Sequence, residues 1–590
     1  MCLYKLFKIT FVISVCIVPT LFTGCSSGGS DKKEVKGGKP EVIIWELSDA
    51  DMLNPIIYSD ASSGYILTNM YSQLLNIDFK TLELVPVLAL GRPLFEKTED
   101  GKGLMITYEI RTEATWDNGT PITAKDVEFT LKVIKNPKVK NENNKPYYEF
   151  IRDIKFYPEN PKKFTLISDR VYILAEASSG DYPIMPAYLY DTKGLMNGFT
   201  IKQLNEDKDK LSNDPKINEF ATDFNSEKRQ REKEYIGGSG AYKLEEWATG
   251  QRIVLVRKDK WWGDMVKEKN CFFEAFPPKI IYQTINDQTT ALVALKAGNL
   301  DVMYSIKSKD FKDLPNSAKF TENFNAYTPM QLAYTYIGIN TRLPKFQDKL
   351  TRQAFAHLVD VDKMIKTIKY GQAQRVVGYV HPSKKDVYNS SITPYDFNPQ
   401  KAKTLLAQAG WKDSNGDGTL DKMINNERVD LSFDFAVNSG NDERKSVALL
   451  FQEEAAKIGI KVNVVAQEWS VYLDNCKAHK IEMFFGAWIG TPIPNDPKQI
   501  YHTESYNGGS NYTGFGNKES DALIDSIRIQ IDEVKRGMLE KQLQQVLHDE
   551  VSYIYLWAPT ERIAIHKRFE NAETSVTRPG FWEAGFKVAK

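Results

Sequence analysis

Runs of apolar residues alternate with polar stretches at two periods, one typical of β-strands and one typical of α-helices. A strand over 279–285 precedes a helical stretch that starts at Asp287 and stops at Gly298, and a second strand follows at 300–303. A strand–helix–strand unit of this kind implies that its two strands pair in parallel. The pattern therefore predicts an α/β protein.

Residues 235–263 predict a glycine-rich turn that leads into a β-hairpin. The turn is 237–240, and glycine there allows positive φ or a close approach of the backbone to another surface. Two strand-like runs, 241–247 and 252–258, are joined at Thr249–Gly250, and two tryptophans close the stretch.

Helix boundaries can be read at several places. Thr123 predicts an N-cap with Asp126 three residues later, a capping role for this acid rather than a catalytic one. Asn398 and the proline after it start another helix, which Gly410 ends. The apolar positions over 350–370 predict one long helix.

Two further stretches are less patterned. The charged stretch 204–234 predicts a solvated insertion that is helical or mobile. Near the C-terminus, the apolar run 553–557 predicts a buried strand that returns to the first half of the chain.

The length and charge of the chain restrict the possible architectures and functions. A chain of 590 residues is too long for a single compact core, so two or three domains are expected. Lysine plus arginine and aspartate plus glutamate both number 77, so no basic field attracts nucleic acid. Aromatic residues make up 12%, which suits either a binding cleft or a large core.

The N-terminus predicts export. Lys5 and Lys8 precede the apolar run 9–22, which is short for a bilayer span and typical of a secretory signal. The run ends before Cys25, and a flexible polar tether follows it. This arrangement resembles the lipobox of bacterial lipoproteins, in which the cysteine is acylated, although Phe22 departs from the usual small or aliphatic residue. The alternative is an ordinary signal peptide with a chance cysteine.

Two cysteines remain in the mature chain, Cys271 and Cys476. They are far apart in sequence and are expected in separate domains, where a bridge would prevent relative motion; the alternative is a disulfide, which an exporting compartment permits. We therefore expect two separate buried thiols.

Enzyme motifs are not found in the sequence. The stretch 237–241 ends in alanine where a nucleophile elbow needs glycine. The six histidines show no pair at metal-binding spacing, and there is no phosphate-binding loop. The sequence thus favours a protein without catalytic activity or a cofactor.

One loop has oxygen-bearing side chains at alternate positions, as in the first part of a calcium-binding loop. Ile424 stands where the bidentate glutamate should be, so an Asx-rich turn is the alternative. The calcium-ligand candidates are Asp413, Asn415, Asp417, Thr419 and Asp421.

Several ordered landmarks resemble the family-5 solute-binding proteins, the peptide- and nickel-binding receptors of ABC importers. The longest is the run from Val85 to Val133, with its turn at 116–121. The others are the first strand with Leu53-Asn54-Pro55, the hairpin 235–263, the unit 279–303, the segment 483–496 and the segment 505–524.

This resemblance implies a two-lobed periplasmic-binding-protein type II fold with an extra subdomain in lobe 1. It implies a monomer that faces the periplasm and is tethered to a membrane by its lipid. A solute, most readily an oligopeptide, is clamped between the lobes and passed to a permease powered by a cytoplasmic ATPase. The implied parts are signal peptide 1–24, tether 25–40, lobe 1 over 41–328 with a variable subdomain at about 91–234, lobe 2 over 329–552, and a return to lobe 1 over 553–590.

The resemblance also implies which residues lie at the cleft. Peptide-binding members carry an aspartate three residues after the tryptophan that Trp488 matches, and here that position is Thr491, with Asp496 the nearest carboxylate. Because a buried ammonium needs a counter-charge, recognition of a free peptide N-terminus is in question. Trp488 can equally serve in the core. The cleft candidates are Asn54, Ser239, Tyr242, Tyr336, Trp488, Thr491, Tyr506 and Asn511.

Two other functions stay open. The same fold can hold a sugar, an opine-like molecule or a metal chelate. A secreted hydrolase or chaperone-like protein is the alternative from another class.

Overall fold

The computed structural model describes residues 40–141, 144–268, 270–507 and 509–589. The predicted signal peptide, the acylated Cys25 and all but the last residue of the predicted tether lie outside these residues. Among the described residues, none of the helices is both long enough and apolar enough to cross a bilayer.

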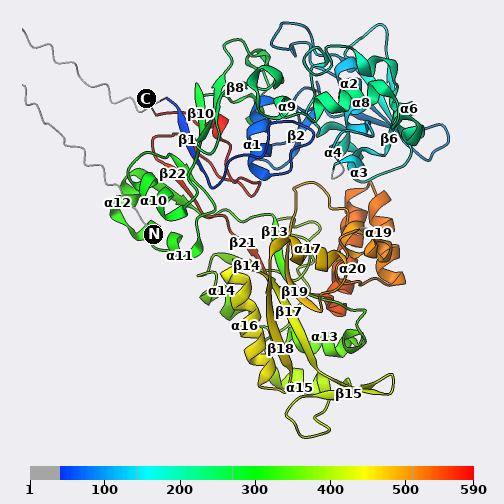
Figure 1. Ribbon diagram of the computed structural model, residues 1–590, viewed down its shortest axis with the longest axis vertical. Helices are drawn as coiled ribbons and strands as arrows, with labels where there is room; N and C mark the ends of the chain where they lie inside the picture. The colour runs from blue at the N-terminus through cyan, green and yellow to red at the C-terminus, as the bar shows by residue number, and fades with distance from the viewer. Residues whose placement is uncertain (1–39, 142–143, 269, 508, 590) are drawn as a thin grey trace, which may run out of the picture. The chain divides into compact units, whose positions relative to one another are not determined.

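A seven-stranded mixed sheet forms the core of what we call lobe 1 (Figure 1). Its central strand β1 pairs in parallel with β10 on one side and with β11 on the other. In sheet order the strands are β12 (Phe324–Tyr327), β22 (Ile563–His566), β11 (Val302–Met303), β1 (Val42–Glu46), β10 (Lys279–Thr284), β9 (Arg252–Arg257) and β8 (Tyr242–Ala248).

A five-stranded mixed sheet forms the core of lobe 2. Here β17 pairs in parallel with both β18 and β19, whereas β13 runs antiparallel to its neighbours. In sheet order the strands are β18 (Lys461–Gln467), β17 (Ser432–Asn438), β19 (Met483–Ile489), β13 (Ala333–Ile339) and β20 (Tyr553–Tyr555). The α/β class predicted from the sequence is confirmed.

A separate antiparallel sheet lies within the sequence of lobe 1. Its strands are β4 (Leu94–Lys97), β5 (Leu104–Glu109), β7 (Lys163–Ser168) and β6 (Ile151–Phe156), and helices including α2 (Ala124–Lys135), α6 (Ile201–Glu206) and α8 (Pro215–Phe224) accompany them (Figure 1). The prediction that residues 204–234 are solvated is wrong for α8. Ile217, Phe220 and Phe224 are fully buried, because α8 carries an apolar stripe within its charged surroundings.

The predicted hairpin is confirmed as β8 and β9, with Gly250 at φ +71° in the turn. The glycine-rich turn before it serves close approach. A Cβ at Gly240 would lie 2.4 Å from the Asn69 carbonyl oxygen, and one at Gly238 would lie 2.4 Å from the Tyr71 ring. Both tryptophans that follow the hairpin donate from Nε1 to the Ser239 carbonyl, at 3.0 and 2.8 Å. Only glycine leaves room for this packing.

The predicted helix caps are also confirmed. Thr123 and Asp126 form a capping box at the start of α2, and Asn398 caps α15 (Pro399–Gln408). The long helix predicted over 350–370 is instead two helices, α13 (Lys349–Ala356) and α14 (Val361–Thr367). Asp360 caps the second of them by accepting from the Lys363 amide, so the chain breaks where a capping acid satisfies new helix donors.

The strand predicted over 553–557 to return to lobe 1 belongs to lobe 2 instead, and the chain returns to lobe 1 after it. Tyr553–Tyr555 pairs with β13 in the sheet of lobe 2, and the return is made by β22. A short, fully buried strand suits either sheet, so the sequence does not specify its partner. Cys271 and Cys476 are both free and buried, one among the core residues of each lobe, as predicted.

Candidate functional site

Each lobe has an edge at which parallel strands end together. In lobe 1 it consists of the residues just after β1, β10 and β11, and in lobe 2 of those just after β17, β18 and β19. Ligands of open α/β sheets bind outside the carboxyl ends of the strands, where loops and unpaired backbone groups gather. We call these residues the carboxyl-end edges.

Glu46 ends β1 and is 6% exposed. Its carboxylate accepts hydrogen bonds from the Tyr304 hydroxyl at 2.8 Å and from the Ser62 hydroxyl at 2.7 Å. Burial raises the pKa of Glu46 to about 7. The next residue, Leu47, is 53% exposed, so an acid and an apolar surface lie side by side at this edge.

A cluster of buried tyrosines lies under the edge of lobe 2. The Tyr336 and Tyr553 rings stack with centroids 3.7 Å apart, and the Tyr501 hydroxyl lies 2.9 Å from that of Tyr334 and 3.3 Å from that of Tyr555. These rings come from β13, β20 and α18 (Lys498–Tyr501). Sequence reasoning did not find the cluster. The alternation of tyrosines in both strands was visible, but their pairing was not.

Trp488 lies above this cluster. It donates from Nε1 to the Tyr553 hydroxyl at 3.3 Å and stacks on Tyr512, while its neighbour Ile489 is 62% exposed. The ring is half-buried, so it packs on the lobe and still presents surface. This position is compatible with both roles that the sequence left open.

The lobes are joined by two crossings of the chain. Met330 forms a β-bridge with Thr560, and the buried Glu561 ties the crossings to lobe 1. Its carboxylate accepts from the Ser305 amide at 2.9 Å and from the Gln331 side chain. Ser305 follows β11, so the crossings meet the carboxyl-end edge of lobe 1.

The other predicted cleft residues fall into two groups. Asn54, Ser239, Tyr242 and Asn511 are almost fully buried. Asn54 caps the Ile56 amide, and Tyr242 donates to the Pro277 carbonyl. Asn54, Ser239 and Asn511 lie in loops, whereas Tyr242 lies in β8.

Thr491 is exposed, and Tyr506 is half-buried. The Tyr506 ring stacks on His479 at 3.8 Å, and the Arg342 guanidinium lies over it at 3.7 Å. Of the predicted set, Tyr336 and Trp488 meet through Tyr553. Ligand contact by any of these residues stays a prediction.

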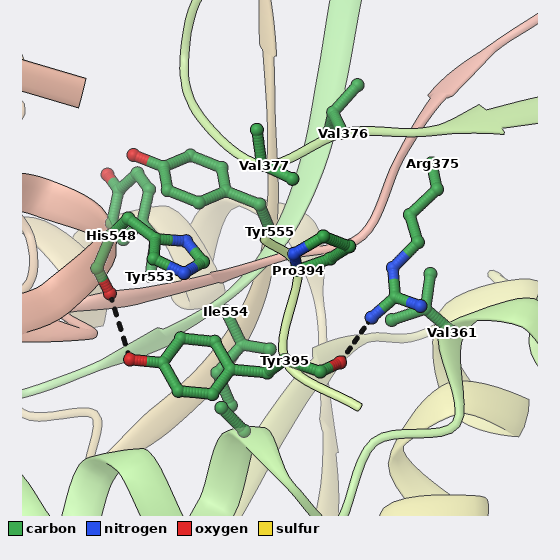
Figure 2. Close-up of a pocket in the computed structure, with 11 residues that line it drawn as sticks. Val361, Arg375, Val376, Val377, Pro394, Tyr395, His548, Tyr553, Ile554 and Tyr555 are labelled. Atoms are coloured by element: carbon green, nitrogen blue, oxygen red, sulfur yellow. Dashed lines mark hydrogen bonds between the residues drawn. The ribbon is translucent and has the colours of Figure 1, made fainter. Parts of the chain in front are cut away.

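A hollow of about 620 Å³ lies beside the loop that follows β19. Lys384 lines it and donates to the Ile493 carbonyl at 2.7 Å, and burial lowers the pKa of Lys384 to about 8. Glu540 also lines it, accepts from the Tyr379 hydroxyl, and has its pKa raised by burial. Figure 2 shows another pocket of lobe 2, around Tyr395 and His548, whose volume of about 20 Å³ has room for one water molecule only.

In the loop over 413–421 the candidate calcium ligands take part in hydrogen bonds within the loop. The Asp413 carboxylate accepts from the Gly416 and Gly418 amides, and Asp421 accepts from the Ser414 hydroxyl and amide. Asn415 donates to Asp417, and the Thr419 amide donates to Asp417 as well. In the described part of the chain, no group of three or more histidine, cysteine or acidic side chains is placed to hold a metal ion. These hydrogen bonds are those of an Asx-rich turn, and calcium binding by this loop stays a prediction.

Two α/β lobes, each with a carboxyl-end edge and joined by two crossings, define a two-lobed solute-binding protein. Residues 83–511 match the family described as bacterial extracellular solute-binding proteins, family 5 Middle. The chain belongs to this family, whose members are solute-binding receptors.

Known relatives are similar to this protein along nearly the whole chain. The oligopeptide-binding protein AppA of Bacillus subtilis is 27% identical over 576 residues, which cover 95% of each chain. The solved structure of the Bacillus subtilis AppA with a nonapeptide has a TM-score of 0.68 at 24% identity and covers 93% of this chain and 99% of that one. NikA of Brucella suis in complex with Fe(III)-EDTA has a TM-score of 0.73 at 20% identity, with coverages of 93% and 100%. These structures establish the fold.

Proposed function

We propose that this protein is the extracytoplasmic receptor of an ABC importer and that it captures an oligopeptide between its lobes. The observation that carries the proposal is the similarity to the oligopeptide-binding AppA, which extends over 95% of both chains. The receptor delivers the peptide unchanged to a permease, and a cytoplasmic ATPase supplies the energy.

The chemistry of the two edges supports a peptide. An extended peptide main chain can be held by backbone hydrogen bonds whatever its sequence. The exposed Leu47 and Ile489 and the half-buried Trp488 supply apolar surface for side chains. Closure of the lobes about the two crossings stabilises the complex when the contacts to both lobes outweigh the cost of closing.

A metal chelate is the second candidate, because NikA with Fe(III)-EDTA shares the fold. A chelate held by its organic ligand needs no metal-binding side chains on the protein. This candidate differs from the first in the solute and leaves the receptor role unchanged.

We also propose that Cys25 is acylated and anchors the receptor, as a monomer, to the outer face of a membrane. The support is the sequence around this cysteine and the polar tether after it. Replacing Cys25 with serine should release the protein from washed membranes. Retention of the variant in the membrane fraction would contradict the anchor.

A thermal-shift assay with peptides of two to ten residues, Ni(L-His) and Fe(III)-EDTA tests the solute. A ligand that binds only the folded receptor stabilises it by about 2.7 kcal/mol at a hundredfold excess over Kd. We expect peptides to raise Tm. A rise with a chelate alone would favour the second candidate, and hydrolysis of the added peptides would contradict the receptor role.

Trp488→Leu should weaken peptide binding by about tenfold or more, because an aromatic surface next to the ligand is lost. Trp582→Leu is the matched control. Trp582 is also half-buried and donates a single Nε1 hydrogen bond, at 2.9 Å to the Cys271 carbonyl, but it lies in the core of lobe 1. An equal loss in both variants would show that Trp488 acts through stability only.

A further inference from the structure

The segment after β19 contains a single carboxylate. Residues 483–496 read MFFGAWIGTPIPND, so Asp496 is the only acid that this stretch can offer to a cationic group. An ammonium that leaves water needs such a counter-charge. The partners of Asp496 therefore decide whether this part of lobe 2 can bind one.

Asp496 is already paired with Arg528, at the C-terminal end of α19 (Lys518–Ile529). The Arg528 Nε lies 3.0 Å from Oδ1 and 2.9 Å from Oδ2 of Asp496, and the Lys498 amide donates to Oδ1 at 3.0 Å. The two side chains are only 18% and 26% exposed. Charge-assisted hydrogen bonds of this kind, partly screened from water, are strong.

The pair is held from lobe 1 as well. The Tyr172 hydroxyl donates to Asp496 Oδ2 at 3.4 Å, and the Arg528 guanidinium lies over the Tyr172 ring at 5.8 Å. The Ile173 amide donates to the Arg528 carbonyl at 2.9 Å, and the Ile173 side chain packs against the hydrophobic core of lobe 2 that contains the buried tyrosines. Arg528 is thus fixed by its own lobe and by the segment after β7.

Other acids near this pair are poor substitutes. Glu540 is buried and accepts from Tyr379. Asp386 and Glu533 line the rim of the 620 Å³ hollow but are exposed, and an exposed ion pair contributes little to binding. Lys384 and Arg536 line the same hollow and add positive charge.

We propose that Arg528 is a specificity-determining residue that neutralises Asp496 and makes ligand binding independent of a free N-terminal ammonium. The receptor then takes N-terminally blocked peptides as well as free ones, and length and side chains decide affinity. This proposal rests on the peptide-receptor function and specifies the substrate class of that same site.

The test uses the tightest peptide from the panel above and its N-acetylated form, with both Kd values measured by calorimetry on the mature protein. For the native chain we expect the two values to agree within about twofold. Arg528→Met should free Asp496 and favour the unblocked peptide by about tenfold or more, the effect of one hydrogen-bonded charge. Arg528→Lys keeps a cation and should keep the native ratio.

The double variant Arg528→Met with Asp496→Asn removes the freed carboxylate and should restore the native ratio. A native ratio of ten or more, or an unchanged ratio in a folded Arg528→Met variant, would overturn the proposal while peptide binding stands. Failure of both peptides to bind the native protein would refute the peptide-receptor function, and this proposal with it. The ratio of the two Kd values for the native protein tests the proposal even if a variant does not fold.

Discussion

Replacing Glu46 with glutamine should remove a pH dependence of stability that arises from the burial of this carboxyl group at the end of β1. Glu46 is buried, and its carboxyl contacts two neutral donors, Tyr304 and Ser62. Burial raises its pKa from 4.5 to about 7. Between these values the native protein holds a proton that the unfolded chain has released, so stability falls as the pH rises from the lower value to the higher.

The magnitude follows from the two pKa values. Their difference corresponds to about 3 kcal/mol of stability that is present at pH 4 and lost by pH 8. Glutamine keeps the shape and has no proton to release, and the Ser62 hydroxyl can turn to accept from its amide. Glu46→Gln should therefore equal the native protein in stability at pH 4 and exceed it by about 3 kcal/mol at pH 8.

Urea unfolding at pH 4, 6 and 8 measures this difference, provided that the m-value is the same for both proteins. Glu583 is buried nearby, burial raises its pKa too, and its charge adds to the rise in the pKa of Glu46. Glu533→Gln, whose side chain is 85% exposed, is the control and should change stability little at any pH. A Glu46→Gln variant that is less stable than the native protein at pH 8, or a difference independent of pH, would refute the reasoning.

Two further predictions concern lobe 1. Arg568→Met should lower the free energy of unfolding by about 3–5 kcal/mol, because Arg568 pairs with the buried Asp301 at 2.6 Å and its loss leaves that carboxylate without this partner. The control is Arg252→Met, which breaks an exposed pair with Glu246 and should change the free energy of unfolding by less than about 1 kcal/mol. Equal effects of the two substitutions in urea unfolding would contradict this prediction. Gly240→Ala should cost about 1–3 kcal/mol or prevent folding, since the new Cβ would lie 2.4 Å from a backbone oxygen. Gly237→Ala meets only the flexible Leu189 side chain at 3.3 Å, and it should be tolerated when Tm is compared.

Local signals predicted the local structure well. The hairpin β8–β9 and the caps of α2 and α15 follow from turn chemistry and from side chains that satisfy neighbouring amides, and those interactions lie within a few residues. The break between α13 and α14 carried such a signal in Asp360, but the apolar periodicity on both sides of it obscured the break.

The candidate site depended much more on distant contacts. Trp488 was found from its segment, yet the tyrosines that support it come from strands more than two hundred residues apart in sequence. The partner of Asp496 could not be foreseen either, because Asp496 lies in a loop and Arg528 lies 32 positions away on α19. Side chains such as Asn54 and Asn511 matched the expected segments, but burial directs their amides to neighbouring backbone groups.

The sequence by itself determined the α/β class, the family, the hairpin and the starts of several helices, because periodicity, capping and turn residues act over short distances. The tertiary structure decided which sheet takes the strand Tyr553–Tyr555, how the tyrosine cluster assembles beneath Trp488, and that the single acid of the segment after β19 is neutralised by Arg528. These outcomes depend on pairing between distant segments, and an apolar strand or a charged side chain does not specify its partner by composition alone.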